Sequence, residues 1–249
     1  MRVVRHTQYI NSRKRRARWT ALIGFVLLTS TLWIALNPNF ILPAYGMMLV
    51  GFIIFNIGMQ QMGKWSRNPR NDQLIDHALR DVSDKFVIVH YPPIGDHRVE
   101  HVVVHPGGVL ALVAREMDGE IHGHGRAWRR SGGGLRRFFT FSGPQLGNPS
   151  REAAENAAVI EEFLEANQLS VDVEAAIVFL HPHVELQVEN PEYPVLLLDE
   201  VATFLHELVP DPTFTGAERD RLLDLLGGGE GVERPITQRA RRPVKRRAA

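Results

Sequence analysis

Five histidines close together in the sequence are the first candidates for metal chemistry. His97, His101 and His105 share a parity, so on a β-strand their side chains would lie on one face, and His122 and His124 follow nearby. Imidazole nitrogens bind transition metals well. However, the spacing matches no established zinc motif, and a Pro-Gly-Gly turn ends the strand directly after the third histidine. We therefore favour structural roles for these histidines over a metal site.

A run of arginines interleaved with aromatic residues is the second candidate. No acidic residue occurs between Glu120 and Glu152. Arginine pairs with phosphate groups and aromatic rings stack on bases, so the run is typical of the wall of a nucleic-acid groove. It suits contact with anionic lipid headgroups equally well. The expected binding residues are Arg126, Trp128, Arg129, Arg130, Arg136 and Arg137.

The composition indicates a folded protein whose charges are segregated along the chain. The 249 residues are 44% hydrophobic and 23% charged, which is ordinary for one sizeable domain with accessory segments. Cysteine is absent, which excludes disulfides and Cys-based zinc sites. Residues 1–18 and residues 234–247 hold seven Arg/Lys each and no acid, so residues 19–233 have a charge balance of −13. Such an acidic body is unfavourable for tracking a nucleic-acid backbone.

Two uncharged apolar runs follow the basic N-terminus. Trp19–Leu36 and Phe40–Met59 contain 18 and 20 residues, and at about 1.5 Å rise per residue each is long enough to cross a bilayer as a helix. Residues 37–39 between them predict a short turn. The alternative for the first run is a cleaved signal peptide, but no small-x-small cleavage site follows it. The sequence therefore predicts a transmembrane helical hairpin over residues 19–60.

The distribution of basic residues predicts the orientation of this hairpin. Basic residues flank its outer ends at residues 13–18 and 64–70, whereas the connecting turn is uncharged. By the positive-inside rule both termini and the main domain are cytoplasmic, in a two-span integral protein of the cell membrane. We expect residues 1–18 to be a basic cytoplasmic segment that contacts membrane lipids. Residues 227–249, Gly-rich and then Arg/Pro-rich, are expected to be a disordered basic tail.

Residues 71–226 are expected to form an α/β domain. Apolar residues recur at helical spacing from Leu74 to Val82 and across residues 152–167. Asp199 is expected to cap a helix that runs through Leu208, and Thr215 forms a capping box with Glu218 for a last helix that ends at Gly227. This order predicts a mixed β-sheet flanked by helices. Strands are predicted at residues 86–91, 102–104, 109–113, 175–180 and 195–198, with weaker signals around Trp128 and residues 138–141.

From about Asn71 to Leu208 the chain resembles the nuclease-related domain (NERD) family, a branch of the PD-(D/E)xK nuclease-like folds often attached to membrane helices. The resemblance implies that fold and, as chemistry, phosphodiester hydrolysis in which two carboxylates hold a divalent cation and a lysine helps to position or activate water. The residues that carry it are Asp72 in an acidic first helix, Glu100-His101 before three valines, Pro106-Gly107-Gly108-Val109, Gly119 with Ile121, Trp128, and Asn148-Pro149 opening a long helix.

Carried over residue by residue, the resemblance places the family's helix acid on Asp72 and its β-hairpin acid on Glu100. The Glu-x-Lys pair falls on Val113 and Arg115, and the Gln that usually follows Asn-Pro falls on Glu152. Valine cannot bind a metal, and arginine keeps a charge but cannot accept a proton. The residual family positions are therefore Asp72, Glu100, Arg115 and Glu152, and any Mg²⁺ would have to bind to Asp72 and Glu100.

Three functional hypotheses follow from this incomplete site. The favoured one is a catalytically impaired, cofactor-free domain that acts as a nucleic-acid or protein binding module. The first alternative is a divergent Mg²⁺-dependent nuclease with a migrated carboxylate, for which Glu152 or Glu155 suits better than Glu116, since Glu116 would point to the strand face opposite Val113. The second alternative is a lipid-surface sensor that uses the basic run and both termini.

Overall fold

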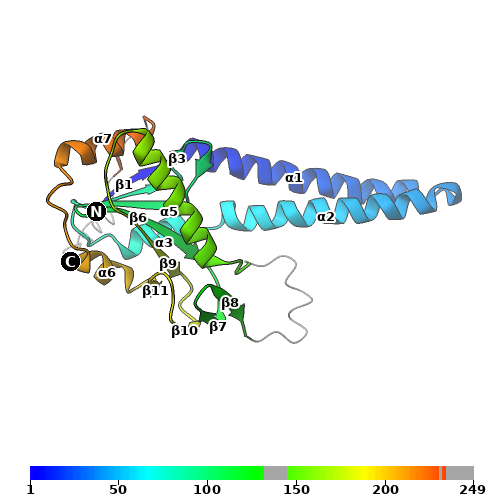
Figure 1. Cartoon of the computed structure of the whole chain (residues 1–249). Helices are drawn as coiled ribbons and strands as arrows, with labels where there is room; N and C mark the ends of the chain where they lie inside the picture. The colour runs from blue at the N-terminus through cyan, green and yellow to red at the C-terminus, as the bar shows by residue number, and fades with distance from the viewer. Residues whose placement is uncertain (132–144, 230–231, 234–249) are drawn as a thin grey trace, which may run out of the picture.

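A computed structural model of the chain describes residues 1–131, 145–229 and 232–233 (Figure 1). Two long antiparallel helices, α1 (Thr7–Ile34) and α2 (Ile41–Ser66), project from an α/β domain and are joined through a 3₁₀ turn, η1 (Pro38–Phe40). The predicted fold class, a mixed sheet flanked by helices and preceded by two apolar helices, is confirmed. The weak strand predicted at residues 138–141 lies outside the described residues.

The domain is built on a seven-stranded sheet with the strand order β11-β9-β6-β5-β2-β1-β12. The β-hairpin β5–β6 lies at its centre, with β2 antiparallel to β5 and β9 parallel to β6. The buried residues along β5 and β6 confirm that the predicted β-hairpin is covered on both faces. The strands are β1 (Arg2–Arg5), β2 (Val87–His90), β5 (His101–His105), β6 (Gly108–Arg115), β9 (Val173–Phe179), β11 (Val195–Leu197) and β12 (Val232–Glu233).

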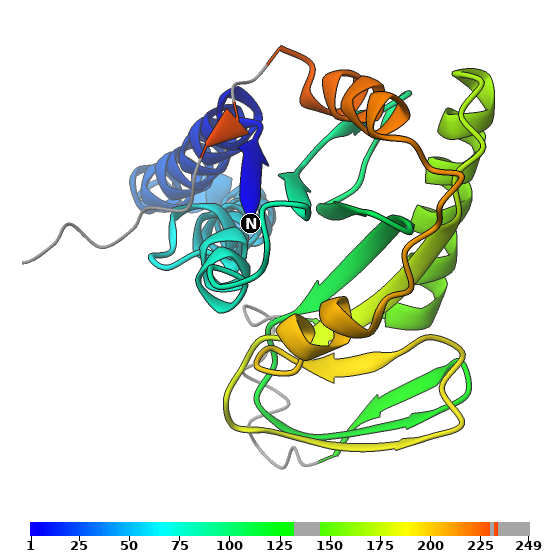
Figure 2. The same ribbon diagram turned by 90° about the vertical axis from the view of Figure 1, so that its left-hand side faces the viewer.

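Two smaller sheets complete the strand structure. β7 (Gly119–His124), β8 (Ala127–Arg130) and β10 (Val184–Glu189) form a three-stranded sheet at the β11 side of the domain (Figure 2). β8 is the strand predicted around Trp128, whereas β10 was not predicted. β3 (Pro93–Ile94) and β4 (His97–Arg98) form a short antiparallel pair.

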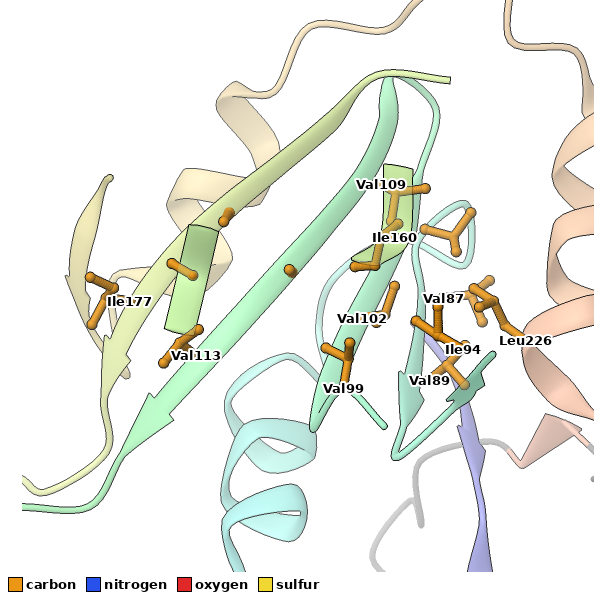
Figure 3. Packing of buried hydrophobic residues seen from close by; sticks show 14 of the residues in the cluster. Val87, Val89, Ile94, Val99, Val102, Val109, Val113, Ile160, Ile177 and Leu226 are labelled. Atoms are coloured by element: carbon orange, nitrogen blue, oxygen red, sulfur yellow. The ribbon is translucent and has the colours of Figure 1, made fainter. Parts of the chain in front are cut away.

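Helices cover both faces of the large sheet. On one face, α3 (Asn71–Ala78) and α6 (Val201–Glu207) bury Ile75 and Leu205 against the even-numbered residues of β6, such as Leu112. On the other face, α5 (Pro149–Ala166) buries Ile160 beside the odd-numbered Val109, and α7 (Gly216–Gly227) buries Leu226 beside Val87 and Ile94 (Figure 3). Complete burial of such a side chain contributes about 1.5–3 kcal/mol to stability, so the two apolar clusters fix the positions of the helices.

The helix-capping predictions have mixed outcomes. The capping box of α7 is confirmed, because the Glu218 carboxylate accepts from the Thr215 N–H at 2.9 Å and the Thr215 hydroxyl accepts from the Glu218 N–H at 3.2 Å. The prediction that Asp199 caps α6 is wrong. Glu200 occupies the cap position, and its carboxylate accepts from the Leu197 N–H at 2.7 Å instead of from the helix. The chain turns tightly between β11 and α6, which moves the helix start one residue beyond Asp199.

The first residues of the chain belong to the domain. The prediction that residues 1–18 form a separate basic segment is therefore wrong for these residues. β1 pairs in parallel with β2, with Val3 opposite Ile88, and antiparallel with β12. Met1 is only 3% exposed, and its ammonium group donates to the Val82 carbonyl and pairs with Asp84 at 3.2 Å. The prediction missed β1 because four residues beside a basic cluster show no periodicity, and their pairing partner is more than 80 residues away.

β12 and the start of α1 also depart from the sequence-based boundaries. Val232 and Glu233 form β12 within the stretch that was expected to be a disordered tail, whereas residues 234–249 lie outside the described residues. α1 starts at Thr7, 12 residues before the apolar run at Trp19. The basic residues 13–18 are therefore helical, and the polar first 12 residues of α1 lie between the domain and the apolar run.

Small residues allow α1 and α2 to pack closely against each other. A Cβ atom on Gly24 would lie 2.3 Å from the Phe55 nitrogen, and one on Gly58 would lie 2.3 Å from the Ala21 nitrogen. Such contacts are typical of helices that associate in lipid. Large apolar side chains such as Trp33 and Leu42 instead point outward, with 79% and 82% of their surface exposed. Both helices are long and apolar enough to cross a membrane.

Candidate functional site

All four residual family positions lie at one end of the large sheet, near the bases of α1 and α2. At this end, which we call the helix-pair end, β1 finishes at Arg5, β2 at His90 and β6 at Arg115, while β5 begins at His101. Asp72 comes from α3, Glu100 directly precedes β5, and Glu152 lies in the first turn of α5. The fold therefore brings to one region the residues that the resemblance pointed to.

Asp72 is completely buried between two arginines. Its two carboxylate oxygens accept from Nε and Nη2 of Arg70, both at 2.9 Å, and the Nε atom of Arg5 lies 2.9 Å from Oδ2. Burial raises the pKa of Asp72, but the Arg70 hydrogen bonds and the charges of both arginines outweigh it, so the pKa lies below its usual value. Asp72 is thus a permanently charged partner of two guanidinium groups.

The ion-pair cluster continues into a chain of buried histidines. Arg5 also pairs with Asp76, and Asp76 contacts Nε2 of His90 at 2.8 Å. The Nδ1 atoms of His90 and His101 lie 2.8 Å apart, so one ring donates and the other accepts. Burial, reinforced by the nearby His90, lowers the pKa of His101 to about 3. Sequence analysis missed Arg5 because strand β1 was not predicted, and it missed Asp76 and His90 because their contact depends on how α3 packs against β2.

The histidines do not form a metal site in the part of the chain that is described. His101 and His105 lie at opposite ends of β5, His97 lies in β4, and His122 and His124 lie in the small sheet. Within residues 1–131, 145–229 and 232–233, no three metal-ligating side chains are grouped in a way that could hold an ion. Although His97, His101 and His105 are spaced so that they could share one strand face, their rings do not come together.

Glu100 and Val113, onto which the resemblance carried two metal-binding acids of the family, lie opposite each other at this end of the sheet. β5 and β6 pair with His101 opposite Leu112, and extending this register by one residue places Glu100 opposite Val113. The Glu100 carboxylate pairs with Nζ of Lys64, from the end of α2, at 2.5 Å. Burial raises the pKa of Glu100, but the charge and hydrogen bond of Lys64, together with the charges of His101 and Arg115, outweigh it, so the pKa lies below its usual value. Val113 is 1% exposed and packs beside Ile177 in the apolar core (Figure 3).

Arg115 and Glu152, which depart together from the family pattern, form an ion pair. The Nη2 atom of Arg115 lies 2.5 Å from Oε2 of Glu152. The same guanidinium group donates from Nε to the Leu146 carbonyl at 2.9 Å. The position of Glu152 is fixed by the start of α5, where the Asn148 side chain accepts from the Arg151 N–H at 3.0 Å. The two positions at which the resemblance implied a lysine and a glutamine are therefore joined in this chain by an ion pair.

The other acids considered as substitutes also have basic partners. Glu116 pairs with Arg67, in the segment that follows α2. Glu155 is exposed and pairs with Arg151 one helical turn away, at 3.3 Å. Neither carboxylate is therefore available as an unpaired ligand beside Glu100.

The described part of the basic run is mostly engaged within the domain. Arg126 pairs with Glu192, and Arg130 pairs with Asp118. The Trp128 indole donates from Nε1 to the Ser150 hydroxyl at 2.7 Å, and its ring centroid lies 5.9 Å from that of Phe179. Trp128 therefore packs α5 and β9 onto the small sheet. Arg129 is exposed, while Arg136 and Arg137 lie outside the described residues.

An aromatic cluster joins the helical pair to the domain beside these acids. Tyr9 of α1, Trp65 of α2 and Tyr91 after β2 have ring centroids 5.3–5.8 Å apart, and the guanidinium group of Arg98 lies 4.3 Å from the centre of the Tyr9 ring. Aromatic pairs of this kind contribute about 0.5–1.5 kcal/mol beyond their buried area. The bases of both helices are therefore attached to the domain rather than linked to it by a free tether.

Comparisons with known proteins agree with the geometry at this end of the sheet. Residues 68–180 match the family model described as nuclease-related domain. No curated protein and no solved structure matches the chain. The matched region includes Asp72, Glu100, Arg115 and Glu152, and it ends at Leu180 rather than extending to Leu208 as the resemblance suggested. The match confirms, for residues 68–180, the resemblance to the nuclease-related domain (NERD) family.

Proposed function

We propose that this chain is a two-span membrane protein whose nuclease-like domain lies in the cytoplasm, is catalytically inactive and acts as a binding module. The observation that carries the proposal is the pairing of each acid at the helix-pair end with a basic residue. Asp72 pairs with Arg5 and Arg70, Glu100 with Lys64, and Glu152 with Arg115. These pairings belong to the framework of the domain, because the basic partners come from β1, β6 and the end of α2 or the segment after it.

The residues at this end do not fit a catalytic Mg²⁺ ion. Magnesium requires hard oxygen ligands in near-octahedral geometry, and hydrolysis needs the ion to polarise phosphate and activate water. Both oxygens of Asp72 already contact guanidinium nitrogens at 2.9 Å, and the position opposite Glu100 is the buried methyl surface of Val113. The migrated-carboxylate alternative is disfavoured because Glu152 pairs with Arg115.

The arrangement of β1 supports membrane insertion with both termini on one side. β1 precedes α1, yet it pairs with β2, which follows α2. A protein that places both strands in one sheet must cross the membrane an even number of times between them. The outward-facing apolar side chains of α1 and α2 favour lipid contact over a soluble core role. The 12 residues from Thr7 to Arg18 form about 18 Å of helix, which would hold the domain above the headgroups.

A protein partner suits the domain better than nucleic acid does. Residues 19–233 have a balance of −13, and Arg126 and Arg130 would have to leave their acidic partners to reach phosphates. Trp128 is already packed against Ser150 and Phe179, so its ring is not a free stacking surface. Arg129 is exposed and forms no ion pair with another described residue.

Incubation of the detergent-solubilised full chain with labelled single- and double-stranded DNA and RNA, with Mg²⁺ or Mn²⁺, tests the absence of catalysis. We expect no cleavage above the buffer background and no difference between the unmodified chain and Glu100→Gln. Cleavage that Glu100→Gln abolishes would overturn the inactive assignment and favour the divergent nuclease. The same samples at low and high salt measure nucleic-acid binding. Tight, salt-sensitive binding that Arg129→Ala weakens would show that the partner is a nucleic acid and not a protein.

Single cysteines test the topology, because the natural chain contains none. Ser12→Cys at the base of α1, Asn39→Cys in the turn and Thr213→Cys in the domain place one exposed thiol at each location. In intact cells, a membrane-impermeant maleimide should label Asn39→Cys alone. In inside-out vesicles it should label the other two. Labelling of Ser12→Cys from outside would contradict the proposed topology.

A further inference from the structure

A pocket of about 520 Å³ opens at the far end of the large sheet, opposite the helix-pair end. Its walls are the turn between β5 and β6, the residues that lead into β9, and the segment that follows α6. The segment after α6 is held against the turn, because the Asp211 N–H donates to the Pro106 carbonyl at 3.2 Å. A Cβ atom on Gly107 would lie 2.1 Å from the Val209 oxygen, so only glycine permits this approach. The pocket is therefore preformed by backbone contacts.

His105 places an unused hydrogen-bond donor at this pocket. Its side chain is 4% exposed and stacks on Phe86, with ring centroids 6.3 Å apart. Nδ1 accepts from the Gly107 N–H at 3.2 Å, which places the hydrogen of the neutral ring on Nε2. Nε2 is buried and has no hydrogen-bond partner among the described residues. A buried donor of this kind costs free energy until an acceptor reaches it.

Four carboxylates line the same pocket, and none of the described residues that line it is a lysine or an arginine. They belong to Asp172, Glu174, Glu207 and Asp211. None of the four forms an ion pair with another described residue, in contrast to the acids at the helix-pair end. The pocket thus presents concentrated negative charge beside one neutral donor. An arginine-rich peptide matches both features, because its guanidinium groups pair with carboxylates and its backbone carbonyls accept hydrogen bonds.

The chain itself contains such a peptide directly after β12. Residues 234–249, RPITQRARRPVKRRAA, hold seven Arg/Lys and no acid. β12 runs antiparallel to β1, with Val232 opposite Val4 and Glu233 opposite Val3. The chain therefore leaves the sheet toward Met1, which lies at the same end as the pocket, because Arg2 aligns with Val87 and Val87 with Val104.

The tail is long enough to reach the pocket. Three strand spacings separate β12 from β5 in the sheet, which amounts to about 14 Å at roughly 4.8 Å per spacing. The 16 residues of the tail span up to about 50 Å when extended. Because the two partners belong to one molecule, binding is favoured by the high effective concentration of a short linker.

We propose that the acidic pocket at the far end of the sheet binds the arginine-rich segment 234–249 of the same chain. Arginine side chains of the segment pair with Glu174, Glu207 and their neighbours, and a backbone carbonyl accepts from Nε2 of His105. Binding there keeps the basic segment on the side of the domain remote from α1 and α2. A partner protein with a basic segment would have to displace it.

Peptide binding to the chain in detergent tests this proposal. A fluorescent peptide of sequence 234–249 is titrated into the chain ending at Glu233 and into the full chain, and its anisotropy is followed at low salt. We expect saturable binding to the shortened chain and at least tenfold weaker binding to the full chain, whose own tail occupies the pocket. Equal binding to both would overturn the proposal, because it would show that the tail does not occupy the pocket within one molecule.

Matched charge variants locate the binding site. In the shortened chain, Glu174→Gln with Glu207→Gln should weaken peptide binding at least tenfold. Glu161→Gln with Glu165→Gln, which removes the same charge from the exposed face of α5, should change it less than twofold. His105→Phe keeps an aromatic ring beside Phe86, lacks the donor, and should weaken binding several-fold. An equal loss of peptide affinity in the two double variants would show that the peptide responds only to the overall negative charge of the domain, and this result would overturn the proposal. Thermal unfolding of each variant confirms that it is folded.

Discussion

Substitution of the buried Asp72 distinguishes most clearly between two roles of this acid, a structural ion-pair partner and a metal ligand. Replacing it by asparagine leaves Arg70 facing a neutral side chain at a completely buried position, while Arg5 keeps Asp76 as its remaining acidic partner. Removing one partner of a buried ion pair costs about 3–5 kcal/mol, because the remaining charge stays uncompensated. In a domain of this size each kcal/mol lowers the Tm by about 2–4 °C, so Asp72→Asn should lower it by roughly 6–20 °C.

Thermal unfolding of the solubilised full chain, followed by tryptophan fluorescence at pH 7, measures this shift in EDTA and again in Mg²⁺. Asp81→Asn is the control, because Asp81 is 87% exposed and its pairing with Arg80 should contribute little. A Tm for Asp72→Asn within about 1 °C of the unmodified protein would refute the ion-pair role. Stabilisation of the unmodified chain by Mg²⁺ that Asp72→Asn abolishes would instead identify Asp72 as a metal ligand.

Three further predictions concern the histidines, the N-terminus and the helical pair. Burial holds the pKa of His101 at about 3 and that of His105 at about 4, below the unfolded value of 6.5. The unfolded state therefore binds more protons below pH 6.5, and the free energy of unfolding should fall as the pH drops from 6.5 toward 4, by up to about 1.4 kcal/mol per pH unit and histidine. Urea unfolding at pH 7.5 and pH 5 measures the fall, and equal values would contradict it. An extension added before Met1 should lower the Tm, because it displaces the buried ammonium group, whereas the same extension after Ala249 should leave it unchanged. Gly58→Leu should separate α1 from α2, because its Cβ would meet the Ala21 backbone, while Gly46→Leu has open space and should be tolerated; cysteine cross-linking between the helices compares the two.

The sequence was most informative where local patterns determine structure. The β5–β6 hairpin follows from buried valines on both sides of a Gly-Gly turn, and the start of α7 follows from Thr215 and Glu218, three residues apart. The absence of a carboxylate at Val113 was visible in the sequence. The missing information was non-local. β1 depends on β2 for its structure, and without β1 the pairing of Arg5 with Asp72 and Asp76 could not be inferred.

The ion pair between Arg115 and Glu152 also could not be predicted from the sequence. Arg115 and Glu152 each looked like an isolated departure from the family pattern, 37 residues apart. Only the packing of α5 against β6 shows that one departure compensates the other. Glu100 and Lys64 repeat this relationship between the domain and α2. A residue-by-residue comparison with a family detects lost chemistry, whereas the interactions that replace it require the fold.

The pairing of β1 with β2 has a consequence for biosynthesis. β1 is synthesised before α1 and α2, yet it cannot pair until β2 emerges more than 80 residues later, after both helices. In a two-span protein, insertion with only one crossing would strand β1 on the wrong side of the bilayer. β2 would then become an open edge that exposes Val87, Ile88 and Val89, and such edges invite aggregation. Completion of the sheet thus acts as a check that the membrane segment has been inserted correctly.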